Sequence, residues 1–214
     1  MVEISFPEGV VAVVRTTDEA LGRTVCLGLA QVDGIAIEVT LTTPGASSVI
    51  RELSSMGARV GAGTVLGVAE VDECVQAGAT FMASPVTDAR VIDRARRHGV
   101  PFAPGVMTPT EALTARSLGA PAVKVFPINA VGGTAFITTL LEPIPDLATV
   151  VSGGVKLSDI AEYLDVGSHA VCVGRSLIDA PAAAAGDIDS VGATARRRLR
   201  EAAVQRRADG GGPC

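Results

Sequence analysis

The sequence predicts an α/β protein in which residues 1–208 form a single (β/α)8 barrel and residues 209–214 form a disordered tail. Three observations lead to this fold class. Eight short apolar runs rich in β-branched residues recur along the 214-residue chain, segments of helical period separate them, and the runs are apolar at nearly every position. Strands that are apolar on both faces belong to a parallel sheet covered by helices, because they have no polar side to turn to water.

The apolar runs predict the strands. In chain order they are VVAVVRT (10–16), GIAIEVTL (34–41), ARVGAGTVL (58–66), TFMASP (80–85), PFAPGVM (101–107), PAVKVFPI (121–128), ATVVSGGV (148–155) and HAVCVGRSL (169–177). An open, doubly wound sheet is the alternative arrangement of such strands. The barrel is favoured for two reasons. There are eight runs, as in a (β/α)8 barrel. The G-x-G-x-x-G turn that a dinucleotide-binding fold requires after its first strand is absent after the first run.

Helices are predicted between the strands from apolar residues that recur every three or four positions. They cover 18–32, 47–57, 68–78, 87–99, 109–119, 134–144, 157–167 and 187–208. Several end at a glycine, the residue that most readily adopts the left-handed conformation at a helix C-terminus. The last helix is amphipathic, and we interpret its arginines as a solvent-facing surface rather than a nucleic-acid-binding patch.

Composition narrows the classes of function. A formal net charge of -5 gives no basic field for nucleic acid or an anionic membrane, and no apolar run approaches the length of a membrane span. No secretory leader is recognised, so we expect a soluble, cytoplasmic protein without nucleic-acid or membrane partners. The cysteines and histidines lack the spacing of a zinc site, so we expect no metal, disulfide or histidine-based triad; they are Cys26, Cys74, Cys172, Cys214, His98 and His169.

Polar residues near the strand ends are the candidates for a functional site, because the reacting groups of a (β/α)8 barrel lie at the C-terminal ends of its strands. They are Arg15, Glu38, Thr40, Thr64, Ser84, Thr108, Lys124, Ser152, Arg175 and Ser176, accompanied by Gly153, Gly154 and Gly174.

Lys124 is the most informative of these residues. It alternates with Ala122 and Phe126 in an apolar strand, so its side chain is expected to point into the barrel. Only Lys124 and Lys156 among the 18 Lys and Arg residues are lysines, and an arginine does not act as an amine nucleophile because its guanidinium stays protonated. Burial lowers the pKa of a lysine and leaves free amine to form a Schiff base. The competing interpretation is a core-packed lysine paired with a carboxylate.

Glu38 is the second charged residue in an apolar run. Its ionisation there is costly, so it should be paired or functional. One interpretation is a structural ion pair with Arg15 or Lys124. The other is a carboxylate near Lys124 that moves protons during imine chemistry.

Glycines end the last two runs, at VVSGGV and VGRSL. Their uncovered backbone N–H groups suit a phosphate, which barrels often bind at this place, although the glycines alternatively only permit tight turns. In GAGT, Thr64 is either a ligand-binding hydroxyl or a residue that closes the strand.

Seven motifs then occur in order: EVTLTTPGA (38–46), GAGTVL (61–66), ASP (83–85), APGVMTPTE (103–111), VKVFPINAVGG (123–133), SGGV (152–155) and GRSL (174–177). Together they resemble the family of 2-keto-3-deoxy-6-phosphogluconate (KDPG) and 4-hydroxy-2-oxoglutarate aldolases. The resemblance implies a class I aldolase, usually a homotrimer, without a metal or other cofactor. Its substrate would be a phosphorylated keto acid, cleaved to pyruvate and glyceraldehyde 3-phosphate.

The resemblance also implies roles for single residues. Lys124 would form the Schiff base and Glu38 would be the acid/base group. Thr64 would bind the pyruvate carboxylate, and Phe126 would pack against the pyruvyl group. The other implied substrate-binding residues are Pro85 and, around the phosphate, Ser152, Gly153, Gly154, Gly174 and Ser176.

One position departs from the family pattern. Many members have an arginine after E-V-T-L, where this chain has Thr42. Arg15 is expected to supply the missing charge, because the first and second strands should be neighbours. Relatives that act on the phosphogalactonate epimer or on 4-hydroxy-2-oxoglutarate show similar changes, so these substrates are alternatives. A barrel that binds a phosphorylated metabolite without aldol chemistry is the alternative of another class.

Overall fold

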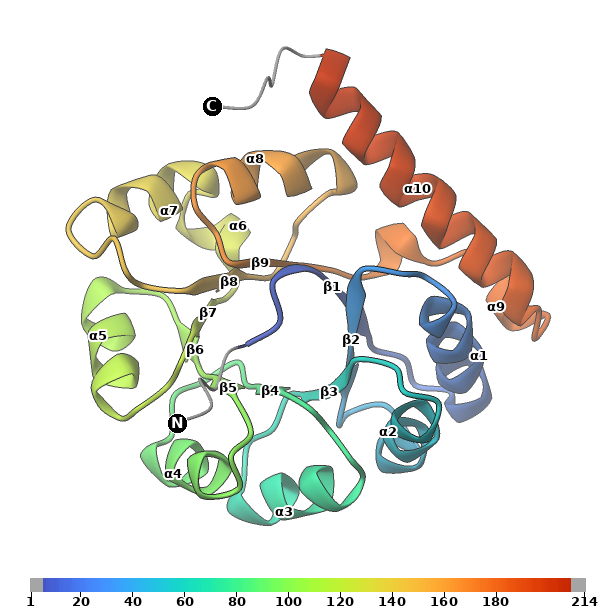
Figure 1. Cartoon of the computed structure of the whole chain (residues 1–214), viewed down its shortest axis with the longest axis horizontal. Helices are drawn as coiled ribbons and strands as arrows, with labels where there is room; N and C mark the ends of the chain where they lie inside the picture. Colours follow the sequence, from blue (N-terminus) through green and yellow to red (C-terminus); the bar gives the residue numbers. More distant parts are fainter. Residues whose placement is uncertain (1–5, 209–214) are drawn as a thin grey trace.

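A computed structural model describes residues 6–208 of the chain. It is an α/β barrel, as the sequence predicts, with a ring of strands enclosed by helices (Figure 1). The strands are β1 (Gly9–Val14), β2 (Ile35–Thr40), β3 (Val60–Gly63), β4 (Met82–Ala83), β5 (Phe102–Ala103), β6 (Gly105–Val106), β7 (Val123–Val125), β8 (Thr149–Val151) and β9 (Ala170–Val173). The predicted tail at 209–214, with Cys214, lies outside the described residues.

The barrel closes through a strand that proline interrupts. The strand order is β5-β4-β3-β2-β1-β9-β8-β7-β6, with parallel pairing of β5 to β4 and of β6 to β7. Both β5 and β6 come from the run 101–107, so the prediction of one continuous strand there is wrong. The reason is Pro104, which has no N–H to give to a ladder, although its carbonyl accepts a hydrogen bond from the Lys124 N–H at 2.7 Å.

The helices lie outside the ring of strands (Figure 1). They are α1 (Glu19–Ala30), α2 (Ala46–Ser55), α3 (Val68–Gln76), α4 (Ala89–Arg97), α5 (Pro109–Ser117), α6 (Ile128–Val131), α7 (Thr134–Leu141), α8 (Ile160–Asp165), α9 (Ala180–Ala184) and α10 (Ile188–Ala208), with short 3₁₀ helices η1 (Leu157–Asp159) and η2 (Arg175–Leu177). Asp18, Asp88 and Thr108 begin α1, α4 and α5 by accepting a first-turn N–H.

The predicted strand at 121–128 is too long. Strand β7 ends at Val125, and Pro127 precedes the short helix α6. A proline cannot continue the ladder as a donor, and the next N–H, that of Ile128, donates instead to the Ser152 carbonyl at 2.8 Å. The chain therefore turns away from the barrel directly after Lys124 and Phe126.

Small side chains fill the inside of the barrel. They come from alternate positions on the strands and include Ala36, Ala83, Ala103, Ala122 and Ala170. Phe6 and Phe81 precede their strands and close the N-terminal end, with ring centroids 5.1 Å apart and planes at 73°. The opposite end is thus left to longer polar side chains.

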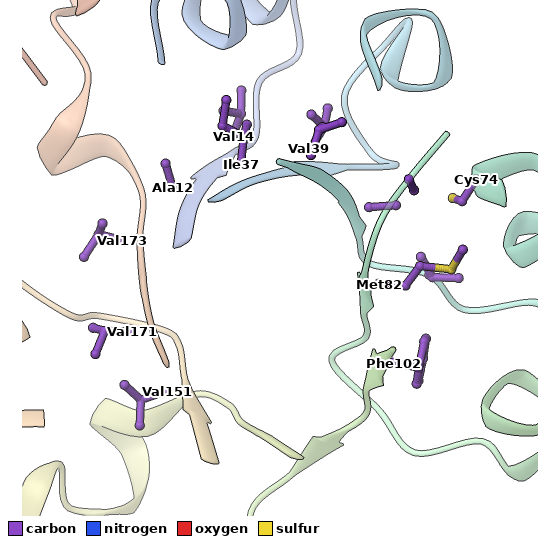
Figure 2. Close-up of a cluster of buried hydrophobic side chains, with 14 of the residues drawn as sticks. Ala12, Val14, Ile37, Val39, Cys74, Met82, Phe102, Val151, Val171 and Val173 are labelled. Atoms are coloured by element: carbon purple, nitrogen blue, oxygen red, sulfur yellow. The ribbon is translucent and has the colours of Figure 1, made fainter. Parts of the chain in front are cut away.

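The outward positions of the strands form a second apolar layer, which packs under the helices. Figure 2 shows Val14, Val39, Met82 and Val173 in this layer, with Cys74 contributed by α3. Helices and strands are therefore fixed to each other independently of the polar end of the barrel.

Helix α10 crosses α1 closely at two glycines. A Cβ at Gly28 would lie 2.6 Å from Val191 Cγ1, and one at Gly192 would lie 2.7 Å from the Gly28 carbonyl oxygen. The interpretation of the α10 arginines as a solvent-facing surface is wrong for Arg198, which is half-buried and donates to main-chain carbonyls described below. Between residues 6 and 208, no helix is long and apolar enough to cross a membrane.

Candidate active site

A buried ion pair crosses the C-terminal end of the barrel. Lys124 on β7 and Glu38 on β2 lie on strands that are not neighbours, yet Lys124 Nζ donates to the two carboxylate oxygens of Glu38 at 2.8 and 2.9 Å. The two side chains are 7% and 1% exposed. Both charged residues point into the barrel, and Glu38 pairs with Lys124 rather than with Arg15.

The surrounding sequence makes room for this pair. Ala122 precedes Lys124 on the inward face of its strand and is buried without filling the centre of the barrel. On β3, Gly63 lies beside Glu38, and a Cβ at this glycine would overlap the Glu38 carboxylate. Gly63, the second glycine of GAGT, is therefore required for the close approach of the Glu38 side chain.

The ion pair changes the expected protonation of Lys124. Burial lowers the pKa of this amine, but the charge and hydrogen bonds of Glu38 raise it, and the net effect is a pKa above the ordinary value of 10.5. The prediction of a partly neutral amine is thus wrong in the absence of substrate, because the contact with Glu38 outweighs the effect of burial. A proton must leave Lys124 before its nitrogen can act as a nucleophile.

Arg15 and Thr64 form the next contact at this end of the barrel. Arg15 Nη2 donates to Thr64 Oγ1 at 3.1 Å. Thr64 has a φ of 61°, a left-handed conformation that costs a β-branched residue roughly 1–2 kcal/mol. Residues held in such conformations cluster at ligand sites, which favours a ligand-binding role for Thr64 over that of a residue that only closes a strand.

Thr42, at the departure from the family pattern, is turned into a network of hydroxyl groups. Thr40 Oγ1 lies 3.1 Å from Thr42 Oγ1, 3.2 Å from Thr43 Oγ1 and 3.2 Å from the Val14 carbonyl. The Thr16 N–H donates to Thr43 Oγ1 at 3.3 Å. These contacts join the loops after β1 and β2 and hold the backbone on both sides of Arg15.

Two adjoining cavities open at this end. The smaller, of about 40 Å³, is lined by Glu38, Lys124, Val13, Arg15, Thr64, Pro85, Phe126 and Ser152. The larger, of about 510 Å³, shares Val13, Arg15, Phe126 and Ser152 and continues past Gly153, Gly154, Gly174, Arg175 and Ser176. The structure brings together the ten residues implied by the family resemblance and Arg15, whereas Thr40, Ser84 and Thr108 line neither cavity.

The glycine pair after β8 has a backbone that other residues rarely adopt. Gly153 and Gly154 have φ values of 93° and 83°, and a Cβ at Gly153 would lie 2.8 Å from Pro127 Cα. Within residues 6–208 the N–H groups of these glycines donate to no backbone or side-chain acceptor. They remain available to an anion in the larger cavity.

The hydroxyl of Ser176 differs from its implied role. Ser176 Oγ has essentially no exposed surface and no hydrogen-bond partner among the described residues. It therefore contacts an anion only after its side chain rotates, whereas the backbone of the loop already lines the cavity.

Cys172 is a cavity residue that the candidates predicted from the sequence do not include. It precedes Gly174 on the inward face of β9 and lines the larger cavity, and it is 4% exposed. Burial raises the pKa of its thiol to about 12. The parity of the strand, which Cys172 shares with Gly174, is the signal that places it inside the barrel.

Comparison with known proteins identifies the family. The profile described as KDPG and KHG aldolase matches residues 6–194. The 2-dehydro-3-deoxy-phosphogluconate aldolase of Treponema pallidum is 36% identical over 166 residues, which are 77% of this chain and 79% of that protein. The 2-dehydro-3-deoxy-6-phosphogalactonate aldolase of Escherichia coli is 35% identical over 173 residues, which are 78% and 83% of the two chains.

Solved structures agree with this result. One described as native KDPGal superposes with a TM-score of 0.74 at 31% identity, over 91% of this chain and 96% of the other. A cube-shaped cage designed by fusing symmetric oligomeric domains superposes with a TM-score of 0.76 at 29% identity, over 95% and 76%. The chain therefore belongs to the KDPG and KHG aldolase family and is a lyase.

Proposed function

We propose that this aldolase cleaves a 2-keto-3-deoxy-6-phospho sugar acid of the KDPG type to pyruvate and glyceraldehyde 3-phosphate through a Schiff base on Lys124. The observation that carries the proposal is the buried Lys124–Glu38 pair on the wall of the smaller cavity. A lysine and a carboxylate in contact are the nucleophile and the proton carrier that imine chemistry needs. Family membership favours this reaction over a barrel that only binds a phosphorylated metabolite.

The first half of the reaction forms the imine. Glu38 accepts the proton of Lys124, and the neutral amine adds to the C2 ketone of the substrate. The same carboxyl group then protonates the departing hydroxyl of the carbinolamine, which leaves as water. The products of this half are an iminium and an ionised Glu38, so the charge of the original pair is conserved.

The second half breaks the carbon–carbon bond. Glu38 accepts the proton of the C4 hydroxyl, the C3–C4 bond breaks, and its electron pair moves into the iminium to give the enamine of pyruvate. The aldehyde leaves with the C4 oxygen as its carbonyl. Glu38 returns the proton to C3, and addition of water releases pyruvate and restores Lys124.

The cavities suit the two ends of such a substrate. Arg15 and Thr64 lie beside the ion pair and would bind the keto-acid carboxylate. Pro85 and Phe126 would supply apolar walls for the pyruvyl group. The phosphate would lie in the larger cavity, at the segment 152–154 and at Gly174 and Ser176.

Reductive trapping tests the mechanism. Borohydride added with pyruvate should reduce the imine to a stable secondary amine, and peptide mass mapping should find it on Lys124. An adduct on Lys156, which is exposed beyond the glycine pair, or no adduct, would defeat the proposal. Lys124→Arg keeps the charge and should abolish cleavage, because guanidinium forms no Schiff base.

The phosphogalactonate epimer and 4-hydroxy-2-oxoglutarate are the second candidates for the substrate. The observation that favours the epimer is the similarity to the phosphogalactonate aldolases of Escherichia coli and Rhizobium meliloti, at 35% and 36% identity. Ratios of kcat/KM for the two phosphorylated epimers and 4-hydroxy-2-oxoglutarate decide among them. Equal values with and without the distal phosphate would contradict the proposed phosphate site.

We also infer a homotrimer. Exposed large hydrophobic side chains support it, because five of them lie on the loops after β3, β4 and β6, at the start of α3 and on α5. They form a surface suited to another subunit: Leu66, Val68, Val86, Met107 and Leu113. Mass photometry should report three copies, and Val86→Glu should dissociate them, whereas Met56→Glu should not.

The cytoplasmic location stays a prediction from the sequence.

A further inference from the structure

Arg175 is a cation in the larger cavity for which the family resemblance gives no role. It is the first residue of η2, directly after Gly174, and it lines the cavity beside the glycine pair. Its side chain is exposed and has no hydrogen bond or ion pair with any residue whose side chain the structure describes. An arginine with five unused N–H donors is suited to bidentate contacts with a phosphate.

The charges around this cavity all have one sign. Its lining contains two arginines, Arg15 and Arg175, and no aspartate or glutamate, although the chain as a whole has a net charge of -5. Glu38 lines the smaller cavity, where its carboxylate is paired with Lys124. Such a wall raises the local concentration of anions and disfavours neutral ligands.

The nearest carboxylate in the sequence does not neutralise Arg175. Asp179 accepts from the Ala182 N–H at 3.1 Å, which begins α9, and from Thr194 Oγ1 of α10 at 3.1 Å. These contacts turn Asp179 toward the helices, so its carboxylate is not paired with Arg175, and the guanidinium can contact an anion in the cavity.

The two arginines share the larger cavity, and Arg15 also borders the smaller one. Arg15 borders both cavities and donates to Thr64 beside the ion pair, whereas Arg175 borders only the larger one of the two. Arg15 is therefore shared with the reacting centre, whereas Arg175 belongs only to the cavity that contains the glycine pair.

We propose that Arg175 is a specificity-determining residue that selects substrates carrying a distal phosphate, by pairing with the phosphate held at Gly153 and Gly154. The inference rests on the proposed function and adds to it a charged partner that the backbone groups alone do not supply. Arg175 takes no part in imine chemistry, so it acts on substrate binding and leaves the chemical step unchanged.

The test compares KDPG with 2-keto-3-deoxygluconate, which has a neutral hydroxyl in place of the phosphate. Arg175→Ala should raise KM for KDPG about ten- to hundredfold, the scale of a lost charge-assisted hydrogen bond, with kcat within about threefold because the bond-breaking step is untouched. KM for 2-keto-3-deoxygluconate should not change. Competitive inhibition by inorganic phosphate should weaken in the same variant, and Arg175→Lys should recover part of the affinity at low salt.

Arg116→Ala is the matched control, since Arg116 lies in the last turn of α5 and lines neither cavity. It removes the same charge and should leave both KM values unchanged. Equal losses for the two substrates, or an unchanged KM for KDPG, would overturn the role of Arg175. If the unaltered enzyme forms no borohydride adduct on Lys124, the proposed function itself fails, which is a different result from these.

Discussion

Lys124 remains in an apolar strand because Glu38 supplies an opposite charge and two hydrogen bonds in the same buried space. Removing one partner of such a pair leaves an uncompensated buried charge, whose cost is about 3–5 kcal/mol unless the group loses its proton. The pair therefore holds the resting enzyme together and stores, on one residue, the proton that the first step must move.

Glu38→Gln separates the two proposed roles of the pair. Turnover should fall by about 10²–10⁴-fold, the usual contribution of a general acid or base. Lys124 should still be trapped by pyruvate and borohydride, although more slowly, because Glu38 also assists imine formation. Pyruvate release is followed with a coupled dehydrogenase assay, and the adduct by intact mass. Full turnover in this variant would exclude Glu38 as the proton carrier.

The same variant should change the pH dependence of stability. In the unaltered protein the pKa of Lys124 is raised above 10.5, so its stabilising contribution is complete below that pH and is lost as the pH rises through the folded-state pKa. In Glu38→Gln, burial remains and the raising partner is gone, so the pKa falls and stability should increase with pH up to 10.5. Urea unfolding from pH 7 to 10 measures the two slopes, and parallel slopes would contradict the assignment.

Thr64 is expected to lower the stability of the fold through its backbone conformation and to improve ligand binding through its hydroxyl. Thr64→Asn places a residue that tolerates the left-handed conformation at a φ of 61°, and should raise the free energy of unfolding by about 0.5–1 kcal/mol. It also removes the hydroxyl that accepts from Arg15, so KM for the keto acid should increase. Chemical denaturation and steady-state kinetics on one preparation check both effects; a variant with lower stability would argue against strain at Thr64.

At the scale of elements, each of the eight predicted runs contains a strand. The inward direction of Lys124 was also predictable, because alternation survives in strands as short as β7. The lengths of the strands were not predictable in the same way. Pro104 divides one run into β5 and β6, and Pro127 ends another, yet whether a proline interrupts a strand or lies at its edge depends on the neighbouring strand.

The contact between α10 and the segment after β9, which lines the larger cavity, was also not predictable from the sequence. Arg198 Nη1 donates to the Ser176 and Ile178 carbonyls at 2.9 and 3.0 Å. Helical periodicity shows that Arg198 lies near the edge of the apolar face, but the carbonyls it binds belong to another element. The direction of the Lys124 pKa shift was not predictable either, because burial lowers this pKa and Glu38 raises it, and the strand pattern does not show which effect is larger.

Arg198→Ala should loosen the segment that carries Arg175 and Ser176. Two carbonyls lose their donor, which should reduce the free energy of unfolding by about 1–3 kcal/mol, and KM for the phosphorylated substrate should rise more than kcat falls. Arg197→Ala is the control from the same helix turn, because Arg197 and Glu201 are 56% and 60% exposed and such pairs contribute at most about 1 kcal/mol. Equal effects of the two variants would remove any special role for Arg198.

Over the whole molecule, the two ends of the barrel have different tasks. The N-terminal end is closed by Phe6 and Phe81, and His169 Nε2 lies 2.8 Å from the Phe6 carbonyl oxygen. The C-terminal end keeps the ion pair, the arginines and both cavities. The candidate chemical groups therefore lie at one end of the barrel axis, and the apolar closure by Phe6 and Phe81 lies at the other.

Phe6→Ala should therefore destabilise the fold without changing the site. Phe6 is 1% exposed, and its truncation should cost about 3–5 kcal/mol, seen as a lower Tm in calorimetry. At temperatures where the variant is folded, KM and kcat should match those of the unaltered enzyme. Met56→Ala is the control, because Met56 is 60% exposed and its truncation should change neither the Tm nor the kinetics. A changed KM in Phe6→Ala would show that the two ends of the barrel are coupled.

Arg198 lies beyond residue 194, where the family match ends. The proposed catalytic pair, Lys124 and Glu38, lies within the matched residues, whereas the side chain that holds the loop around the distal end of the substrate comes from α10. A substitution at Arg198 can therefore change the affinity for the phosphorylated end of a substrate while the reactive amine and its carboxylate stay unaltered.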